Sequence, residues 1–397
     1  MKNTNRFVYF PLIILMLICL LSSPEGFCSD SYAQWQNGLS KNPDYFPIAV
    51  WLQNPRNAEK YKAIGINLYI GLWQGPTEQQ LKDLEHAGMR VICSQNAVGL
   101  DNLNNPTIAG WMHQDEPDNA QPVVDSKTGK KSYGPPVKPA KIIEDYKKLQ
   151  KNDPTRPIIL NLGQGVANDE WKGRGIWGKK EDYPGYAKGC DILSFDVYPV
   201  AGIKKPDGEN YLWYIAKGLK RLADWSNHEK ILWNCIECTH ISNEKAKATP
   251  HQVKAEVWMS IIHGSKGIIY FVHEFKPKFN EDTLLDDAVM REAVSQINHQ
   301  IHSLAPVLNT KTVKGLVSVE SSNPDAPIAI AGKRFNNATY VFAMGMRNQA
   351  VQGKFTVQTP GLDKKVTVLN EDRVILLQDG HFTDKFNPYD VHIYKID

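Results

Sequence analysis

The chain has 397 residues, of which 42% are hydrophobic and 22% are charged, an ordinary globular composition with room for one large domain and a smaller one. Its formal net charge of +3 at pH 7 is small, and the sequence contains no stripe of basic residues. This balance excludes a protein that binds nucleic acid mainly through its charge.

The first 28 residues have the pattern of a secretory signal peptide. Lys2 and Arg6 precede an apolar run over 7–21, and small or polar residues follow it. The run is too short for a comfortable membrane span, so we expect no stable span in the mature chain. We expect cleavage after Cys28 and export of the mature chain to the periplasm or the medium. Lipid anchoring at Cys19 or Cys28 is the alternative, although the residues before both cysteines fit a lipobox poorly.

The cysteines that remain after cleavage are expected to be buried side chains of the core and not metal ligands or redox-active thiols. Three of the four fall in or beside expected buried strands, where a thiol usually behaves as a small hydrophobe. The pair Cys235-x-x-Cys238 also admits a zinc or redox site, but no second pair follows and the motif lies at a strand end. We therefore expect no metal and no cofactor. The four cysteines are Cys93, Cys190, Cys235 and Cys238.

From residue 46 onward, apolar runs alternate with amphipathic helical stretches. Continuous apolar strands are typical of a parallel sheet covered on both faces, so the fold class expected for 29–305 is α/β, a (β/α)8 TIM barrel. A doubly wound open sheet would show the same alternation, but no glycine-rich phosphate fingerprint follows the first strand. The expected strands are 46–52, 66–73, 90–94, 108–116, 156–162, 191–199, 230–237 and 267–272, and the expected helices are 55–64, 77–87, 139–150, 211–225, 250–263 and 284–304.

Beyond residue 305 the pattern changes to short, often β-branched runs separated by turn residues. We expect 306–397 to form a small C-terminal antiparallel β-sandwich that packs against the barrel and carries no chemistry of its own. The runs are 328–330, 339–346, 354–358, 366–369, 374–377 and 391–396.

Two glutamates close strand-like runs that are far apart in the sequence. Glu116 ends the fourth run directly before Pro117, and Glu237 ends the seventh run. The carboxyl ends of barrel strands form one mouth, and strands four and seven face each other across it. Paired carboxylates across such a mouth can break a glycosidic bond.

Each glutamate could be catalytic or could have only a structural role. Asp115 beside Glu116 should raise the pKa of a proton donor, and a solvated loop acid is the alternative. Glu237 ends a very apolar strand, where a carboxylate needs partners, and a buried ion pair with Arg or Lys is the alternative. Glu274 is the rival nucleophile at the end of strand eight.

An acid before proline at the end of strand four, with a second Glu at the end of strand seven, resembles glycoside hydrolase clan A of retaining barrel enzymes. The run 386–392 is similar to the entry into the accessory β domains of many barrel glycosidases. The resemblance implies Glu116 as acid/base and Glu237 as nucleophile. The clan usually has Asn before the acid/base. Here Asp115 can accept a hydrogen bond from a sugar hydroxyl but cannot donate one.

Further side chains at the expected mouth are candidates for binding substrate. Two long loops, about 118–138 and 163–189, should shape the pocket, and the second is rich in aromatic residues that could stack on sugars. Besides Asp115 and Glu274, the candidates are Trp73, Asn96, Asn161, Trp171, Trp177, Asp196, Tyr198, His240 and His273.

Taken together, these patterns predict an exported glycosidase that cleaves a poly- or oligosaccharide with retention. A carbohydrate-binding barrel without catalysis, a metal-dependent hydrolase and a structural surface protein are the alternatives. His113 and His240 flank the acids, but strand one lacks the His-x-His of metal-dependent barrels. We expect carbohydrate as the partner and no nucleic acid, and the sequence does not indicate an oligomeric state.

Overall fold

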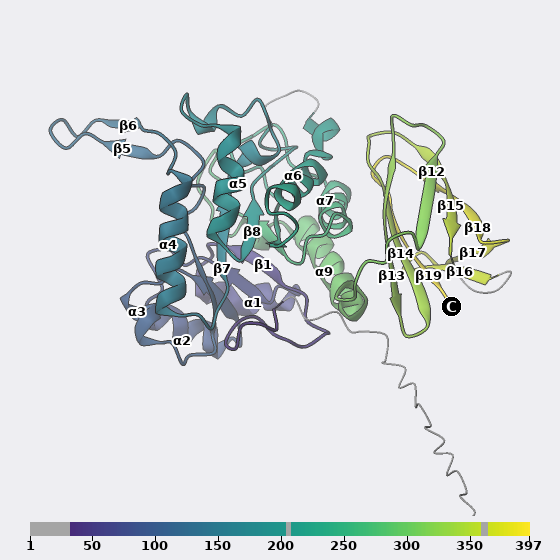
Figure 1. Cartoon of the computed structure of the whole chain (residues 1–397), viewed down its shortest axis with the longest axis horizontal. Helices are drawn as coiled ribbons and strands as arrows, with labels where there is room; N and C mark the ends of the chain where they lie inside the picture. Colours follow the sequence, from purple (N-terminus) through teal and green to yellow (C-terminus); the bar gives the residue numbers. More distant parts are fainter. Residues whose placement is uncertain (1–31, 204–207, 359–363) are drawn as a thin grey trace, which may run out of the picture.

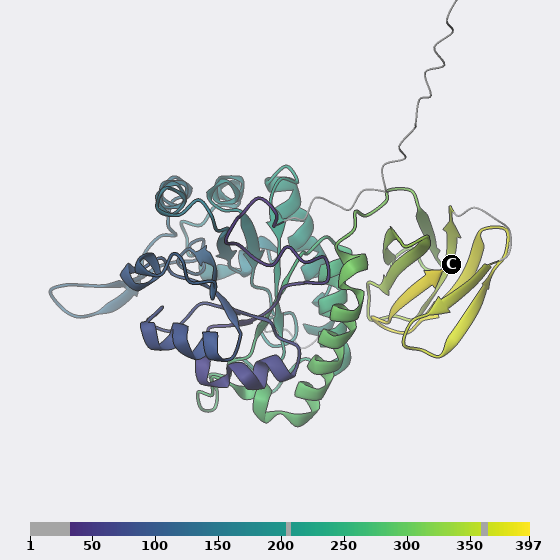
Figure 2. The same cartoon turned by 90° about the horizontal axis from the view of Figure 1, so that it is seen from below.

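The computed structural model of the chain describes residues 32–203, 208–358 and 364–397. A helix-covered barrel and a C-terminal β domain lie side by side, and the helix α9 (Ala288–Leu308) runs along the junction between them (Figures 1 and 2). The expected signal peptide, 1–28, lies outside the described residues. Within the described part, the helices are too short or too polar to cross a bilayer.

The expected (β/α)8 barrel is confirmed. Its parallel sheet has nine strands in the order β10-β11-β1-β2-β3-β4-β7-β8-β9, and β10 also contacts β8, which closes the ring. The expected seventh strand is present as two strands, β9 and β10, which are separated by Trp233. The strands are β1 Ile48–Trp51, β2 Leu68–Ile70, β3 Arg90–Cys93, β4 Ile108–Met112, β7 Ile158–Leu162, β8 Ile192–Phe195, β9 Ile231–Leu232, β10 Asn234–Glu237 and β11 Ile268–Phe271.

Alternation along each strand divides the barrel into an inner and an outer core. On β1, Ile48 and Val50 join the core beneath the helices, whereas Ala49 joins the cluster inside the barrel. The segment after residue 31 covers the amino end of the barrel. There the indole Nε1 of Trp233 donates a 2.9 Å hydrogen bond to the Tyr32 hydroxyl, which donates to the carbonyl of Lys266.

The expected helices are also present, and local signals explain their ends. Thr77 and Gln80 form a capping box at the start of α2, and Gly88 follows its end with a φ of +61°. The short helices α3 and α5 were not expected. The helices are α1 Ala58–Ala63, α2 Glu78–His86, α3 Ala97–Asp101, α4 Pro139–Asn152, α5 Tyr183–Tyr186, α6 Tyr214–Trp225, α7 Pro250–Ile262, α8 Thr283–Asp286 and α9.

The long loop after β4 holds an antiparallel hairpin that the sequence did not predict. Its strands, β5 (Pro122–Val124) and β6 (Lys131–Tyr133), are exposed and project from the barrel beyond α4 (Figure 1). Helix α9 continues to Leu308, three residues past the expected end of the barrel domain at 305. It passes through Pro306 in its last turn.

The C-terminal β-sandwich is confirmed as well. One sheet has the order β12-β15-β18 and the other β13-β14-β19-β16-β17, with Phe355 and Phe382 stacked in the core between them. Trp258 of α7 stacks on Phe342 of β14, so the sandwich packs against the barrel as expected. The strands are β12 Val317–Ser321, β13 Ile328–Phe335, β14 Ala338–Gly345, β15 Val351–Val357, β16 Lys364–Val368, β17 Arg373–Leu377, β18 His381–Phe386 and β19 Val391–Ile396, of which β12 and β18 were not expected.

Candidate active site

An open cavity of about 790 Å³ lies at the carboxyl ends of the barrel strands. This is the face on which barrel enzymes place their chemistry. Both acidic and aromatic side chains line its wall. The lining residues are Trp51, Leu52, Trp73, Asp115, Glu116, Gln164, Trp171, Asp196, Tyr198, Ile241, Phe271, His273, Phe275, Phe279 and Glu281.

One buried amide connects two of the acids. Asn161, near the end of β7, donates from Nδ2 to Asp115 Oδ1 at 3.0 Å and to Asp196 Oδ1 at 2.9 Å. The two carboxylate oxygens therefore lie no more than about 6 Å apart. The Ser194 hydroxyl donates to Asn161 Oδ1, and the Tyr198 hydroxyl donates to Asp196 Oδ2, so the orientations of Asn161 and Asp196 are both constrained.

Glu116 follows in a turn that directs its side chain toward the same cavity. Its φ of +43° is in the left-handed region, which costs a non-glycine residue on the order of 1–3 kcal/mol. Its backbone N–H donates to the carbonyl of Asn161, and its Oε2 accepts a 2.8 Å hydrogen bond from Asn119. Trp171 in turn donates to Asn119, so the turn, the carboxyl and the aromatic loop are connected.

The shared site changes how these acids titrate. Burial, followed by the charges of Asp196 and Asp115, raises the pKa of Glu116 to about 9. Burial and the charge of Asp196 raise the pKa of Asp115 to about 7. Burial also raises the pKa of Asp196, although hydrogen bonds from its neighbours oppose that rise. At neutral pH the cluster can therefore hold a proton on Glu116 beside an ionised aspartate.

Glu237 does not share this cavity, which corrects the expected pairing with Glu116. Its side chain is completely buried, and it does not line the cavity. Its Oε1 accepts a 2.7 Å hydrogen bond from the N–H of Val200, and its Oε2 accepts a 2.6 Å bond from the N–H of Ala201. The loop after β8 thus lies over the end of β10 and uses both oxygens of this carboxylate.

A second buried acid, Glu256 of α7, interacts with Glu237 from the helical side of the sheet. Burial, opposed by the two backbone hydrogen bonds, raises the pKa of Glu237 to about 7. Burial and then the charge of Glu237 raise the pKa of Glu256. Among the described residues, no Arg or Lys pairs with Glu237, and its contacts there are two backbone amides and another carboxyl.

Most of the other expected substrate contacts do reach the cavity. Trp73, Trp171 and His273 line it together with Asp115, Asp196 and Tyr198, and Asn161 lies beneath the acids. Burial lowers the pKa of His273, so its ring is neutral at physiological pH.

Four expected contacts lie elsewhere. Asn96 caps α3 by accepting from Gly99 N–H, and its amide donates to the carbonyl of Pro76. The Nδ1 of His240 is directed at the carbonyls of Asn243 and Ala246 within its own loop. Neither Trp177 nor Glu274 lines the cavity, and the backbone of Glu274 pairs with that of Asn280.

Several lining residues were not predicted from the sequence. Trp51, Leu52 and Phe271 are the last residues of strands β1 and β11 or follow directly, which is a signal that could have identified them. The remaining ones come from loops, whose paths a strand pattern does not reveal. They are Gln164, Ile241, Phe275, Phe279 and Glu281.

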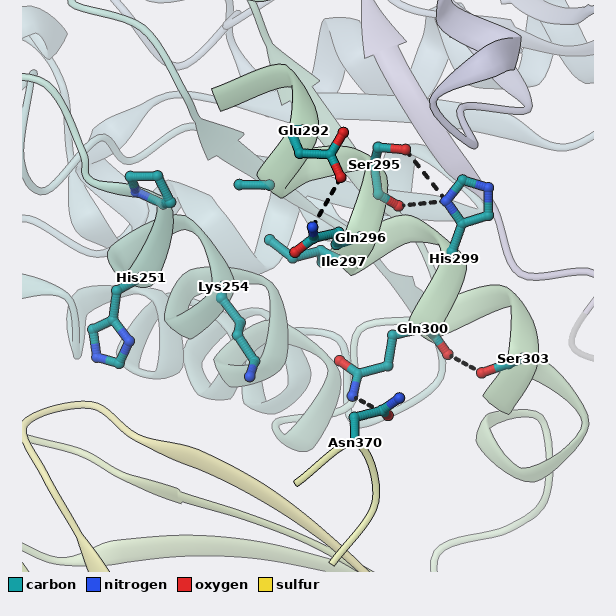
Figure 3. Close-up of a pocket in the computed structure, with 12 residues that line it drawn as sticks. His251, Lys254, Glu292, Ser295, Gln296, Ile297, His299, Gln300, Ser303 and Asn370 are labelled. Carbon is teal, nitrogen blue, oxygen red and sulfur yellow. Dashed lines mark hydrogen bonds between the residues drawn. The ribbon is translucent and has the colours of Figure 1, made fainter. Parts of the chain in front are cut away.

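A second cavity of about 860 Å³ lies between the helices α7 and α9 and the sandwich (Figure 3). Its polar side chains mostly pair with one another, as Gln296 does with Glu292 and Gln300 with Asn370. It contains none of the clustered acids of the barrel mouth. In the described ranges, no group of three or more His, Cys, Asp or Glu side chains is placed to hold a metal ion.

Neither protein-family models nor curated proteins match this sequence. Among solved structures, AmyP in complex with maltotriose superposes with a TM-score of 0.54 at 10% identity, over 93% of this chain and 99% of that one. An alpha-amylase from Lactobacillus plantarum gives 0.48 at 11% identity (89% and 99% covered), and a GH30 endoxylanase from Clostridium papyrosolvens gives 0.46 at 11% (92% and 97%). The first likeness shows that this chain shares the fold of AmyP over 93% of its length.

Proposed function

We propose that the protein is a glycoside hydrolase that cleaves a poly- or oligosaccharide with retention of configuration. The observation that carries the proposal is the cluster of Asp115, Glu116 and Asp196 at the strand ends of one open barrel cavity. Two carboxyl groups with separated protonation states are what this reaction needs. The fold shared with AmyP, which was solved with maltotriose bound, supports the same class of substrate.

Glu116 acts as the acid/base. Its raised pKa, about 9, keeps it protonated at neutral pH, and it lines the cavity, where a glycosidic oxygen can approach it. In the first step its proton goes to the leaving oxygen as the bond from that oxygen to the anomeric carbon breaks. Asn119 then stabilises the carboxylate that remains by donating to its Oε2.

Asp196 replaces Glu237 as the nucleophile in this proposal. It lines the cavity, and hydrogen bonds from Asn161 and Tyr198 stabilise its charge. One of its oxygens forms a bond to the anomeric carbon as the leaving oxygen departs. In the second step Glu116 takes a proton from water, the water oxygen bonds to the anomeric carbon, and the Asp196 carboxylate leaves.

Asp115 has a supporting role. It shares the Asn161 amide with Asp196, and its pKa of about 7 lets it hold a proton or release it as the neighbouring charges change. An ionised Asp115 accepts a hydrogen bond from a sugar hydroxyl, and it raises the pKa of Glu116.

The test is a screen of the mature protein against a polysaccharide panel, with the product anomer followed by NMR. We expect hydrolysis of at least one glycan with retention, and loss of turnover in both Glu116→Gln and Asp196→Asn. Binding without hydrolysis would favour a carbohydrate-binding barrel instead. If Asp196→Asn retains activity and Glu237→Gln loses it, Glu237 and not Asp196 is the nucleophile.

Export of the chain is a separate proposal that rests on the sequence pattern of residues 1–28. Expression of the full chain in a bacterial host, followed by fractionation and N-terminal mass spectrometry of the product, checks it. We expect a soluble exported product that has lost the leader. An uncleaved cytosolic chain would contradict export, and a diacylglyceryl-modified cysteine would show lipid anchoring.

A further inference from the structure

Among the described residues that line the cavity, the side chains that can carry a full charge at neutral pH are all carboxyl groups. Asp115, Glu116, Asp196 and Glu281 line it, and the described lining residues include no Lys and no Arg. The only lining histidine, His273, is neutral because burial lowers its pKa. A sugar that carries a carboxylate or sulfate would therefore meet no countercharge and several carboxyl groups in a partly dehydrated space.

Three described cations lie next to lining residues but do not line the cavity themselves. Arg56 pairs with Glu281 at 3.4 Å and is itself well exposed. Lys276 and Lys278 are exposed on the loop that follows β11, but neither lines the cavity. These lysines could attract an acidic chain to the rim at low salt, but they cannot neutralise it beside the catalytic acids.

Most of the lining aromatic residues lie away from Asp115, Glu116 and Asp196. Trp171 and Tyr198 are the exceptions, because Tyr198 hydrogen-bonds to Asp196 and Trp171 hydrogen-bonds to Asn119, the partner of Glu116. Strands β11, β1 and β2 are neighbours in the sheet, and their ends and loops carry the aromatic arc: Phe271, Phe275 and Phe279 after β11, Trp51 on β1, and Trp73 after β2. Asp115 and Glu116 follow β4, and Asp196 follows β8, on the other side of the ring. A ligand between these two sides has an apolar surface on one face and carboxyl groups on the other.

The aromatic arc also reaches out of the cavity. Trp73 is 70% exposed, Phe275 47% and Phe279 55%. Exposed apolar surface that is grouped beside a cavity is typical of a ligand-binding site. Rings of Phe275 and Phe279 lie 5.7 Å apart, and both also pack near His273. Phe275 and Phe279 therefore extend the apolar surface of the cavity toward solvent.

We propose that this cavity selects an uncharged oligosaccharide, or an uncharged polysaccharide chain, and rejects acidic ones. The inference rests on the proposed function and names its substrate class. The C–H faces of the sugar rings stack on the aromatic arc, and the hydroxyls and the bond to be cut face the acids. Sugars further along the chain contact the exposed rings of the rim.

Calorimetric binding to the mature Glu116→Gln protein tests the proposal without requiring turnover. The probes are neutral oligosaccharides (cello-, xylo-, manno- and malto-hexaoses) and acidic ones (oligogalacturonate and oligomannuronate), each at about 0.05 M and about 0.5 M NaCl. We expect one or more neutral probes to bind at both salt concentrations and the acidic probes to show no binding at the higher one. Acidic probes that bind as tightly as the best neutral probe at about 0.5 M NaCl, or a panel in which no neutral probe binds, would overturn it.

The aromatic arc is tested in the same assay. Phe275→Ala and Phe279→Ala should each weaken binding of the best neutral probe by up to roughly tenfold, in line with the energy of a single aromatic contact. Tyr133→Ala is the control, because Tyr133 is also an exposed aromatic residue but lies on the β5–β6 hairpin and does not line the cavity, and it should leave binding unchanged. If all three variants bind the probe equally well, the aromatic arc does not contribute to sugar binding. A protein that binds neutral probes but never hydrolyses them would refute the proposed function and leave this inference standing.

Discussion

Asn161 donates a 2.9 Å hydrogen bond to Asp196, and the same amide nitrogen reaches Asp115 at 3.0 Å. One neutral side chain thus holds two carboxyl groups of the candidate site in place. Because an amide donor favours the ionised form of both acceptors, it also sets the charge of the cluster.

Replacing this amide by a carboxyl should disable the site without removing any acid. In Asn161→Asp the donor is lost and a fourth carboxyl joins the cluster, so the pKa of Asp196 should rise further. We expect kcat/KM to fall by roughly 100-fold and the acid limb of its pH profile to move to higher pH. Asn336→Asp, in an exposed turn of the sandwich, is the control. An unchanged profile in Asn161→Asp would argue against Asp196 as the nucleophile.

The activity should depend on pH in the way that a protonated Glu116 requires. Its pKa of about 9 means that kcat/KM stays high at neutral pH and falls as the pH rises through that value. Glu116→Gln cannot lose a proton, so the little activity that remains should show no basic limb. Initial rates between pH 5 and 10 measure both profiles. If the basic limb persists in Glu116→Gln, a titratable group other than Glu116 causes it.

Stability should depend on pH through the same carboxyl. Because the folded protein raises the pKa of Glu116 to about 9 from about 4.3 in an unfolded chain, it binds this proton more tightly when folded. This contribution to stability is complete below pH about 4.3 and is lost as the pH rises toward 9.

The variant Glu116→Gln isolates this contribution, because the amide does not titrate. Its Tm should fall less than that of the wild type between pH 5 and pH 9, by roughly 2–4 °C for each kcal/mol regained. Glu85→Gln, an exposed substitution on α2, is the control. Equal pH dependence in the wild type and Glu116→Gln would show that the site does not raise the pKa of Glu116.

Glu237 and Asp196 should respond differently to amide substitution. Glu237→Gln leaves one oxygen for the N–H groups of Val200 and Ala201, so one of them loses its acceptor, at a cost of about 1–3 kcal/mol. We expect a lower Tm and a roughly tenfold fall in kcat, because the loop that follows Asp196 loosens. Asp196→Asn should lower kcat by about 10³ or more with little change in Tm.

A covalent label distinguishes the two acids directly. A 2-fluoro glycoside of the correct sugar should accumulate as a glycosyl-enzyme, and peptide mass spectrometry should find it on Asp196. Azide should restore turnover to Asp196→Ala, with inversion, and have no effect on Glu237→Ala. A label on Glu237 would instead require the loop after β8 to move away from its carboxylate.

Removal of metal ions tests the remaining hydrolase alternative. Because the proposed steps use only carboxyl groups and water, prolonged dialysis against EDTA should leave kcat/KM unchanged. A loss of activity that added Zn²⁺ or Ca²⁺ restores would support a metal-dependent hydrolase.

The barrel could be predicted from the sequence because each strand is a short apolar run followed by a helix with its own cap, as in Thr77–Gln80. Glu116 and Asp196 were identified for the same reason, since polar residues directly after buried strands lie at the mouth. The hairpin β5–β6 was missed because its strands are exposed and lack an apolar pattern.

Glu237 shows where this reasoning fails. A strand end predicts a position near the mouth, but the direction of the carboxyl depends on where the chain turns after β8. The N–H groups of Val200 and Ala201 reach Glu237 because that loop returns over β10, and no local pattern around 199–203 indicates it. The aromatic rim at Phe275 and Phe279 was missed for a similar reason, as loop geometry brings it to the cavity.

The hydrogen bond from Trp233 to Tyr32 sets a limit on how the chain can be trimmed. Tyr32 belongs to the segment that covers the amino end of the barrel, and its hydroxyl also donates to the carbonyl of Lys266, just before β11. A cut downstream of this tyrosine would leave the indole of Trp233, inside the barrel, without its acceptor. Recombinant versions that start at the first strand, Ile48, should consequently be poorly soluble.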